Sequence, residues 1–187
     1  NTDKMKRYIE ECRALGITLK TPCLNKSELE FSVPKKGVIY FGLLAIKGIG
    51  EQVIKPILEE RQQQGSFANF TDFVNRLDLS KVGKKTLQLL IETGALDCFG
   101  VSRKTLLGLV LPAVNYSSDC HVATTLGQRS LFEMVDAEES TVSEVPWNES
   151  DLLAQQKTSV FDIEDVFKEK ALLGAFISAH PMDYYAA

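Results

Sequence analysis

The sequence predicts a mainly α-helical chain with a small β-hairpin near its start and an acidic, partly irregular C-terminal segment. Apolar residues recur at helical spacing in several segments that end at a glycine, as helices often do. β-prone runs are short and few, and they lie before residue 42. Ser, Thr, Asp and Glu dominate residues 115–150 with little periodicity. The 187 residues, 44% of them apolar, are enough for one core and a smaller second unit.

Residues 1–41 are expected to form the first unit. Apolar positions from Asp3 to Leu15 follow a helical repeat that ends at Gly16. Residues 17–19 are then extended up to the break at Pro22. The runs 31–33 and 38–41 flank Pro34-Lys35-Lys36-Gly37, which predicts a short β-hairpin.

Residues 42–114 are organised around the tetrapeptide Lys47-Gly48-Ile49-Gly50, which lies between the apolar run LLAI and an amphipathic helix that ends at Gly65. Glycines allow a tight turn and close approach to a ligand because they lack a Cβ. Gly50 opens the helix, so free N–H groups at its N-terminus can bind an anion. This is the pattern of a helix-hairpin-helix, which contacts DNA phosphates without reading bases. The alternative is an ordinary tight turn between packed helices, with the fold used as a protein-interaction scaffold.

A second helix–turn–helix follows, which predicts a tandem helix-hairpin-helix domain. Residues 84–93 are helical by pattern, Gly94 to Gly100 turn the chain, and Ser102 caps a helix that runs into Pro112. Residues 34–110 hold eleven basic and seven acidic side chains, while residues 111–187 hold four and thirteen. The basic block suits a polyanion. The candidate DNA contacts are Lys47, Gly48, Ile49, Gly50, Lys81, Lys84, Lys85, Arg103 and Lys104.

Residues 115–149 are expected to be a linker that carries the segment Gln128-Arg129-Ser130-Leu131-Phe132. A linker has no core in which to bury Leu131 and Phe132. They either fold back on the domain or dock into an apolar pocket of a partner. Residues 150–187 are expected to hold helices at 150–156 and 162–173, an extended stretch at 175–178 and a turn at His180-Pro181.

The pieces of this sequence, in this order, resemble the C-terminal half of the bacterial replicative DNA polymerase III alpha subunit. The stretches that carry the resemblance are YIEECRALGI, NKSELEFSV, FGLLAIKGIGE, GSFANFTDFVNRLDLSKVGKKTLQLLIETGALD, GQRSLFEM and EKALLGAFISAHPMDYY. The resemblance implies the end of a fingers region at residues 1–41 and a tandem helix-hairpin-helix domain that binds duplex product DNA. It also implies that Gln128, Ser130, Leu131 and Phe132 bind the β sliding clamp, and that residues 150–187 lead into an OB-fold domain. Other subunits of the polymerase complex are implied partners.

Two features depart from the family's pattern. Pro56 is unexpected inside the helix after the first hairpin, and the segment QQKTSVFDIEDVFKEK looks longer than the family's usual spacer.

Other classes of function find little support in the sequence. Two-metal nucleotidyl transfer needs clustered carboxylates, and no compact Asp-x-Asp pattern occurs. The resemblance places the catalytic aspartates and their Mg²⁺ in a part of the family N-terminal to this chain, so we expect no catalytic residue and no cofactor here. The four cysteines form no CxxC pair, which favours reduced thiols in a cytoplasmic protein. A metal site at Cys120 and His121 is the least favoured reading. We expect no membrane span, and a piece of a longer protein.

Overall fold

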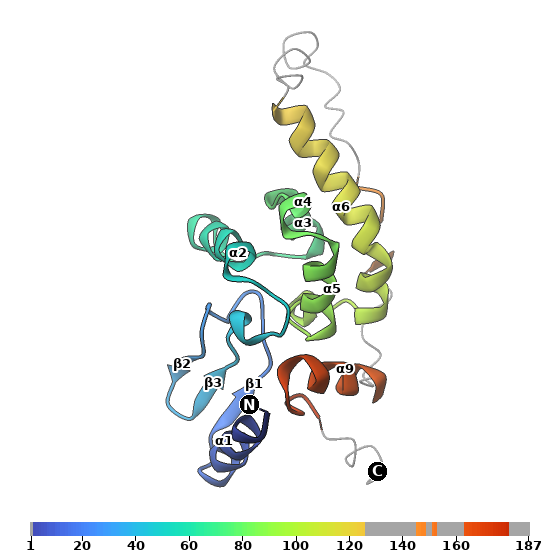
Figure 1. The fold of residues 1–187 in the computed structure, drawn as a ribbon. Helices are drawn as coiled ribbons and strands as arrows, with labels where there is room; N and C mark the ends of the chain where they lie inside the picture. The colour runs from blue at the N-terminus through green and yellow to red at the C-terminus, as the bar shows by residue number, and fades with distance from the viewer. Residues whose placement is uncertain (1, 126–144, 149–150, 153–162, 180–187) are drawn as a thin grey trace.

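The computed structural model describes residues 2–125, 145–148, 151–152 and 163–179 (Figure 1). The chain is mainly helical with one small sheet, as the sequence predicts. In chain order the elements are α1 Thr2–Ala14, β1 Thr18–Lys20, β2 Ser32–Lys35, β3 Val38–Tyr40, the 3-10 turn η1 Leu43–Ala45, α2 Glu51–Gln64, α3 Phe70–Arg76, α4 Leu79–Val82, α5 Lys84–Glu92, the 3-10 turn η2 Asp97–Phe99, α6 Arg103–Thr125 and α9 Ile163–Leu173.

The N-terminal part of the chain folds as a three-stranded sheet with α1 beside it (Figure 1). β2 and β3 form the predicted antiparallel hairpin, with an irregularity between Ser32 and Lys35. β1 adds to the other edge of β3 in parallel, and the strand order is therefore β1-β3-β2. The sequence predicts that the β1 segment is extended but not that it joins this sheet.

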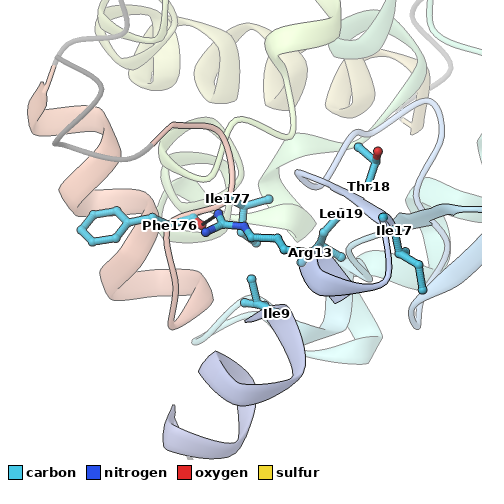
Figure 2. Close-up of a pocket in the computed structure, with 8 residues that line it drawn as sticks. Ile9, Arg13, Ile17, Thr18, Leu19, Phe176 and Ile177 are labelled. Atoms are coloured by element: carbon cyan, nitrogen blue, oxygen red, sulfur yellow. Dashed lines mark hydrogen bonds between the residues drawn. The ribbon is translucent and has the colours of Figure 1, made fainter. Parts of the chain in front are cut away.

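The predicted helix at the start of the chain is present, but its apolar face is only partly covered. Ile9 is buried, whereas Tyr8 and Leu15 are 59% and 70% exposed. Arg13 donates a hydrogen bond to the carbonyl oxygen of Phe176 at 3.3 Å, which ties α1 to the segment after α9 (Figure 2). A pocket of about 330 Å³ lies at this junction, and its lining is largely apolar.

One continuous apolar core lies between α2, α3, α5 and α6. Phe67, Phe70 and Phe73 are fully buried in it. The Phe67 and Phe73 rings meet edge to face at 5.3 Å between centroids, a favourable arrangement for an aromatic pair.

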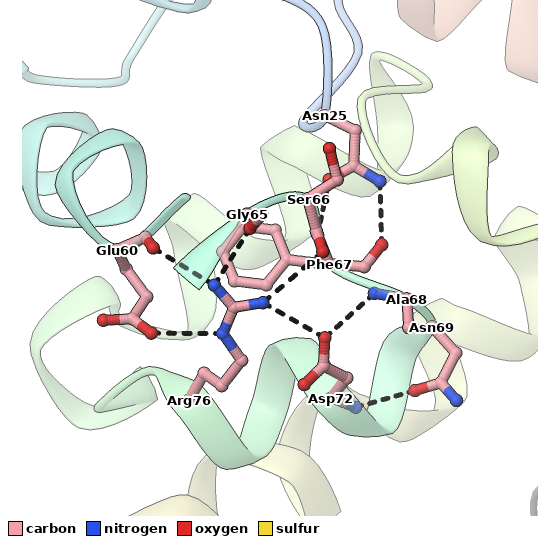
Figure 3. Close-up of polar contacts among 9 residues, drawn as sticks. All are labelled: Asn25, Glu60, Gly65, Ser66, Phe67, Ala68, Asn69, Asp72 and Arg76. Atoms are coloured by element: carbon pink, nitrogen blue, oxygen red, sulfur yellow. Dashed lines mark hydrogen bonds and ion pairs between the residues drawn. The ribbon is translucent and has the colours of Figure 1, made fainter. Parts of the chain in front are cut away.

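The connection from α2 to α3 is held by Arg76 (Figure 3). Its guanidinium donates to the Glu60 carboxylate at 3.1 Å, to the carbonyl oxygen of Gly65 at 3.0 Å and to the Asp72 carboxylate at 3.2 Å. Asn69 caps α3 by accepting a hydrogen bond from the N–H of Asp72 at 2.7 Å. These contacts fix the direction in which α3 leaves α2.

The expected helix end at Pro112 is wrong, because α6 continues to Thr125. Pro112 has no N–H, so the carbonyl of Gly108 loses its usual helical partner. Gly108 is exposed, and water can therefore bind that carbonyl. Pro56 is tolerated in the same way within α2, where the affected carbonyl belongs to exposed Gln52.

Residues 115–125, which the sequence suggested as the start of a linker, belong to this helix. Buried Ser117 joins α6 to α4, since its hydroxyl donates to the carbonyl oxygen of Leu77 at 2.8 Å and accepts from the N–H of Leu79 at 2.9 Å. Trp147 also packs against α3. Its indole N–H donates to the Thr71 hydroxyl at 2.9 Å, and the centroid of its ring lies 5.6 Å from that of Phe70.

The helix predicted at residues 162–173 is α9, which lies against α5 (Figure 1). The N–H groups of Ile177 and Ser178 donate to the Glu169 carboxylate at 3.0 and 2.9 Å, and the Ser178 hydroxyl also donates to it. The chain after Gly174 therefore folds back on α9. Of the helix predicted at 150–156, only residues 151–152 are described, and they are helical. The predicted turn at His180 lies outside the described residues.

Candidate nucleic-acid interface

The Lys47–Gly50 hairpin is open at its tip. Gly48 and Gly50 are exposed, while Ile49 between them is 7% exposed and belongs to the core. Gly48 has φ +86°, which strains any residue with a Cβ. Gly50 is the N-cap of α2 and has no side chain to bond the N–H groups of the first turn. The N–H of Val53 donates to the carbonyl oxygen of Gly50 at 3.1 Å, but those of Glu51 and Gln52 have no intrahelical partner and can bind an anion.

Lys47, expected as a phosphate contact, is engaged with α9. Its N–H donates to the carbonyl oxygen of Leu172 at 3.2 Å, and its ammonium donates to that of Ala171 at 3.0 Å. A cation at the C-terminus of a helix is favoured by the helix dipole. Lys47 therefore holds α9 against the first hairpin.

A second glycine-centred hairpin joins α4 to α5 at Gly83. Gly83 has φ +81° and is the N-cap of α5, again without a side chain to cap the first turn. Asp78 caps α4 by accepting from the N–H of Ser80 at 3.1 Å. Gly83 was missed by the sequence reasoning, which placed the second hairpin at Gly94.

Both hairpins use the same register of buried residues. Ile46 and Ile49 precede Gly50 at the spacing at which Leu79 and Val82 precede Gly83. After each glycine the buried positions again agree, as Ile54, Ile57 and Leu58 in α2 and as Leu87, Leu90 and Ile91 in α5. This shared spacing is the sequence signal that could have located Gly83.

The two helix N-termini differ in charge. The first turn of α2 holds Glu51, which pairs with Lys55 at 2.8 Å and raises the pKa of that lysine. The first turn of α5 holds Lys84 and Lys85, both exposed, and no acidic residue. No ion pair joins either lysine to an acidic residue in the part of the chain that the structure describes. Two cations next to the positive end of the helix dipole are electrostatically unfavourable, and a bound anion would offset this repulsion.

The expectation that Arg103 contacts DNA does not fit the structure, because Arg103 is 4% exposed. Its guanidinium donates to both Asp97 carboxylate oxygens at 3.0 and 2.8 Å and lies 3.8 Å from the buried Glu169 carboxylate. Burial alone would lower the pKa of Arg103, but the Asp97 hydrogen bonds and charge, with Glu169, raise it on balance.

Arg103 leaves no room for a side chain at Gly94. A Cβ at Gly94 would lie 2.2 Å from Nη2 of Arg103, and the residue has φ +78°. The turn from Gly94 to Gly100 thus encloses the Arg103–Asp97 ion pair and is not a second open hairpin.

The remaining predicted cations lie on the surface. Lys81, at the end of α4, is 84% exposed in its side chain and pairs with Asp78 at 3.1 Å. Lys104 is exposed at the start of α6. Lys81, Lys84 and Lys85 therefore flank Gly83, while Lys104 lines a separate groove with Trp147.

The other expected sites are only partly described. Gln128, Ser130, Leu131 and Phe132 lie outside the described residues. Cys120 is half-buried on α6, and the side chain of its neighbour His121 is likewise not described. Within the described ranges, no three His, Cys, Asp or Glu side chains gather as a metal site would require. In the same ranges no helix has the length and apolar character needed to cross a bilayer.

A glycine-centred turn that opens an amphipathic helix, present twice in one register, defines a helix-hairpin-helix domain. Residues 16–106 match the family described as helix-hairpin-helix motif.

Over 99% of its length the chain is 35% identical to DNA polymerase III subunit alpha of Vibrio cholerae, 33% to that of Borreliella burgdorferi and 34% to that of Thermus aquaticus. The chain belongs to this family of polymerase subunits, which confirms the resemblance seen in the sequence. It spans 14–15% of the length of these relatives.

Proposed function

We propose that this chain is a non-catalytic part of a replicative DNA polymerase that binds duplex DNA through phosphates and tethers the polymerase to the β sliding clamp. The observation that carries the DNA-binding proposal is the pair of uncapped, glycine-opened helix N-termini, one of them flanked by exposed lysines. Backbone N–H groups and lysines bind phosphate oxygens of any sequence, so the affinity should not depend on base sequence.

The N-terminus of α5 is the stronger phosphate site of the two. Gly83, Lys84 and Lys85 combine open N–H groups with two positive charges, and Lys81 lies beside them. At α2 the N–H groups near Gly48 and Gly50 are open, but Glu51 opposes an anion and Lys47 is engaged with α9. Lys104 is exposed and can extend the contact, whereas Arg103 is left out because it is buried.

The test is a fluorescence-anisotropy titration of random-sequence duplex DNA across a salt series. The slope of log affinity against log salt is negative, and each lost phosphate contact should make it less steep by about 0.9. The double variant Lys84→Gln/Lys85→Gln should therefore make the slope less steep by about 2. The matched control is Lys35→Gln/Lys36→Gln, which removes the same charge from the end of β2 and the turn that leads to β3 (Figure 1).

Equal slopes for the two double variants would contradict the assignment of α5. If the chain binds no duplex even at low salt, the alternative gains, in which the helix-hairpin-helix fold is a protein-interaction scaffold. The hydrogen bond of Lys47 to α9 is what favours that alternative at the first hairpin.

The clamp-binding part of the proposal rests on the segment Gln128 to Phe132 and the family resemblance. Burial of Leu131 and Phe132 in a pocket of the ring would contribute about 1.5–3 kcal/mol each. Replacing both with alanine should therefore weaken binding to the purified clamp by more than about a hundredfold. Met134→Ala/Val135→Ala, an apolar pair just outside the motif, is the control. Unchanged clamp affinity after loss of Leu131 and Phe132 would reject the assignment.

Together the two attachments would explain processive synthesis. Two contacts to one DNA–clamp assembly act through effective concentration, so the polymerase dissociates far more slowly than either contact alone would allow. Other subunits of the complex are further proposed partners. Nucleotidyl transfer and its Mg²⁺ would belong to another part of the polymerase, which we place in the bacterial cytoplasm, where replication occurs.

A further inference from the structure

The fold brings together two cysteines that are distant in sequence. Cys23 lies in the segment between β1 and β2, and Cys98 lies in η2. The N–H of Leu24 donates to the carbonyl oxygen of Ala95 at 2.8 Å, and the Cys98 thiol contacts the same oxygen at 3.7 Å. The residue after Cys23 and the Cys98 thiol thus meet at one carbonyl oxygen, which places the two cysteines beside each other.

The turn that begins at Cys23 gives the two sulfurs different roles. The N–H of Cys23 donates to the Ser27 hydroxyl at 3.0 Å, and the N–H of Ser27 donates to the Cys23 carbonyl oxygen at 2.7 Å. The neighbouring Cys98 thiol, the N–H groups of Asn25 and Lys26 and the Lys26 charge lower the pKa of Cys23 to about 6, against the opposing effect of burial. The pKa of Cys98 is raised by the Cys23 thiol beside it.

The pair can therefore start a thiol–disulfide exchange. A thiolate attacks a disulfide, and the attack needs access to solvent. Cys98 is exposed and Cys23 is half-buried, so a small reagent can approach from the Cys98 side.

We propose that Cys23 and Cys98 form a reactive dithiol that a low-molecular-weight disulfide oxidises to a Cys23–Cys98 disulfide. The Cys23 thiolate attacks one sulfur of the reagent, which forms a mixed disulfide and releases one thiolate. Cys98 then loses its proton to solvent and attacks the Cys23 sulfur, which releases the second thiolate. Two thiols are oxidised and one disulfide is reduced, so atoms and electrons balance. The new bond would join the segment after β1 covalently to η2.

The test uses oxidised glutathione at pH 7, followed by peptide mapping without reductant. The expected product is a Cys23–Cys98 cross-linked peptide that has lost two hydrogen atoms. In Cys98→Ala, the mixed disulfide should instead accumulate on Cys23, because no second thiol resolves it. Cys12 on α1 and Cys120 on α6 are internal controls and should react more slowly.

A second readout keeps the proposal testable if a variant folds poorly. In the unmodified chain, alkylation of Cys23 by iodoacetamide should reach half its maximal rate near pH 6, and this midpoint should rise by a pH unit or more in Cys98→Ala, with Trp147 fluorescence as the check on folding. The proposal is overturned if the cross-linked peptide is absent. It is also overturned if Cys12 and Cys120 react as fast as Cys23, or if the alkylation midpoint is the same with and without Cys98.

Discussion

Replacement of Arg103 by alanine should destabilise the fold without changing the proposed binding of DNA. The side chain is 3% exposed, and it faces the Asp97 carboxylate at 2.8 Å and the Glu169 carboxylate at 3.8 Å. Arg103 also donates to the carbonyl oxygen of Glu92 at 3.2 Å. Alanine would leave all three acceptors without this cation.

The expected cost is about 3–5 kcal/mol, the usual penalty for removing one partner of a buried ion pair. Glu169 is fully buried and keeps its hydrogen bonds from Ile177 and Ser178, which places the value near the lower end of that range. A change of about 3 kcal/mol lowers the ratio of folded to unfolded chain by more than a hundredfold. It is a large share of the 5–15 kcal/mol typical of a folded domain.

Urea denaturation followed by Trp147 fluorescence measures this change, since Trp147 is the single tryptophan and packs against Phe70 and Tyr116. Lys104→Ala is the matched control, because it removes the same charge from the next, exposed residue and should change stability by less than about 0.5 kcal/mol. Equal unfolding midpoints for the two variants would refute the reasoning. So would a loss of DNA affinity in Arg103→Ala without any loss of stability.

Three further substitutions test the packing by the same denaturation measurement. Gly94→Ala should cost at least about 2 kcal/mol, because φ is positive and the new Cβ would meet Arg103. Gly108→Ala should instead stabilise α6 by about 0.5–1 kcal/mol, since no atom lies within 4 Å of its Cβ and the position is within a helix; equal effects at the two glycines would contradict this account. Ser117→Ala should cost about 1–3 kcal/mol because the buried N–H of Leu79 loses its acceptor, and an unchanged midpoint would show that the bond between α6 and α4 contributes nothing.

The sequence predicts those parts of the fold that depend on local patterns. Apolar periodicity and terminal glycines located α1, α2, α5 and α9, and the Gly48–Gly50 spacing located the first hairpin. α4 was missed because it has only four residues, fewer than one apolar repeat needs to be recognised. The hairpin at Gly83 was missed for the same reason, because it joins α4 to α5.

Arg103 could not be assigned correctly from local sequence for a different reason. An arginine at the start of a helix is usually exposed, and its burial here depends on Asp97 in the preceding turn and on Glu169 in α9. The second partner is distant along the chain, so its approach is a tertiary property. The same holds for Lys47, whose position at the end of α9 appears only in the folded chain.

These long-range contacts give the two hairpins different parts in the proposed interface. The first is anchored by Lys47 on α9, and it lies close to Leu89 of α5, since a Cβ at Gly48 would come within 3.2 Å of that side chain. The second keeps Lys84 and Lys85 exposed at the N-terminus of that same α5. Leu89 lies in α5, the helix whose N-cap is Gly83. The hairpin at Gly48 is therefore next to the same helix that begins at the hairpin at Gly83. If both helix N-termini bind DNA as proposed, a fixed spacing between them would lower the cost of ordering the interface on binding.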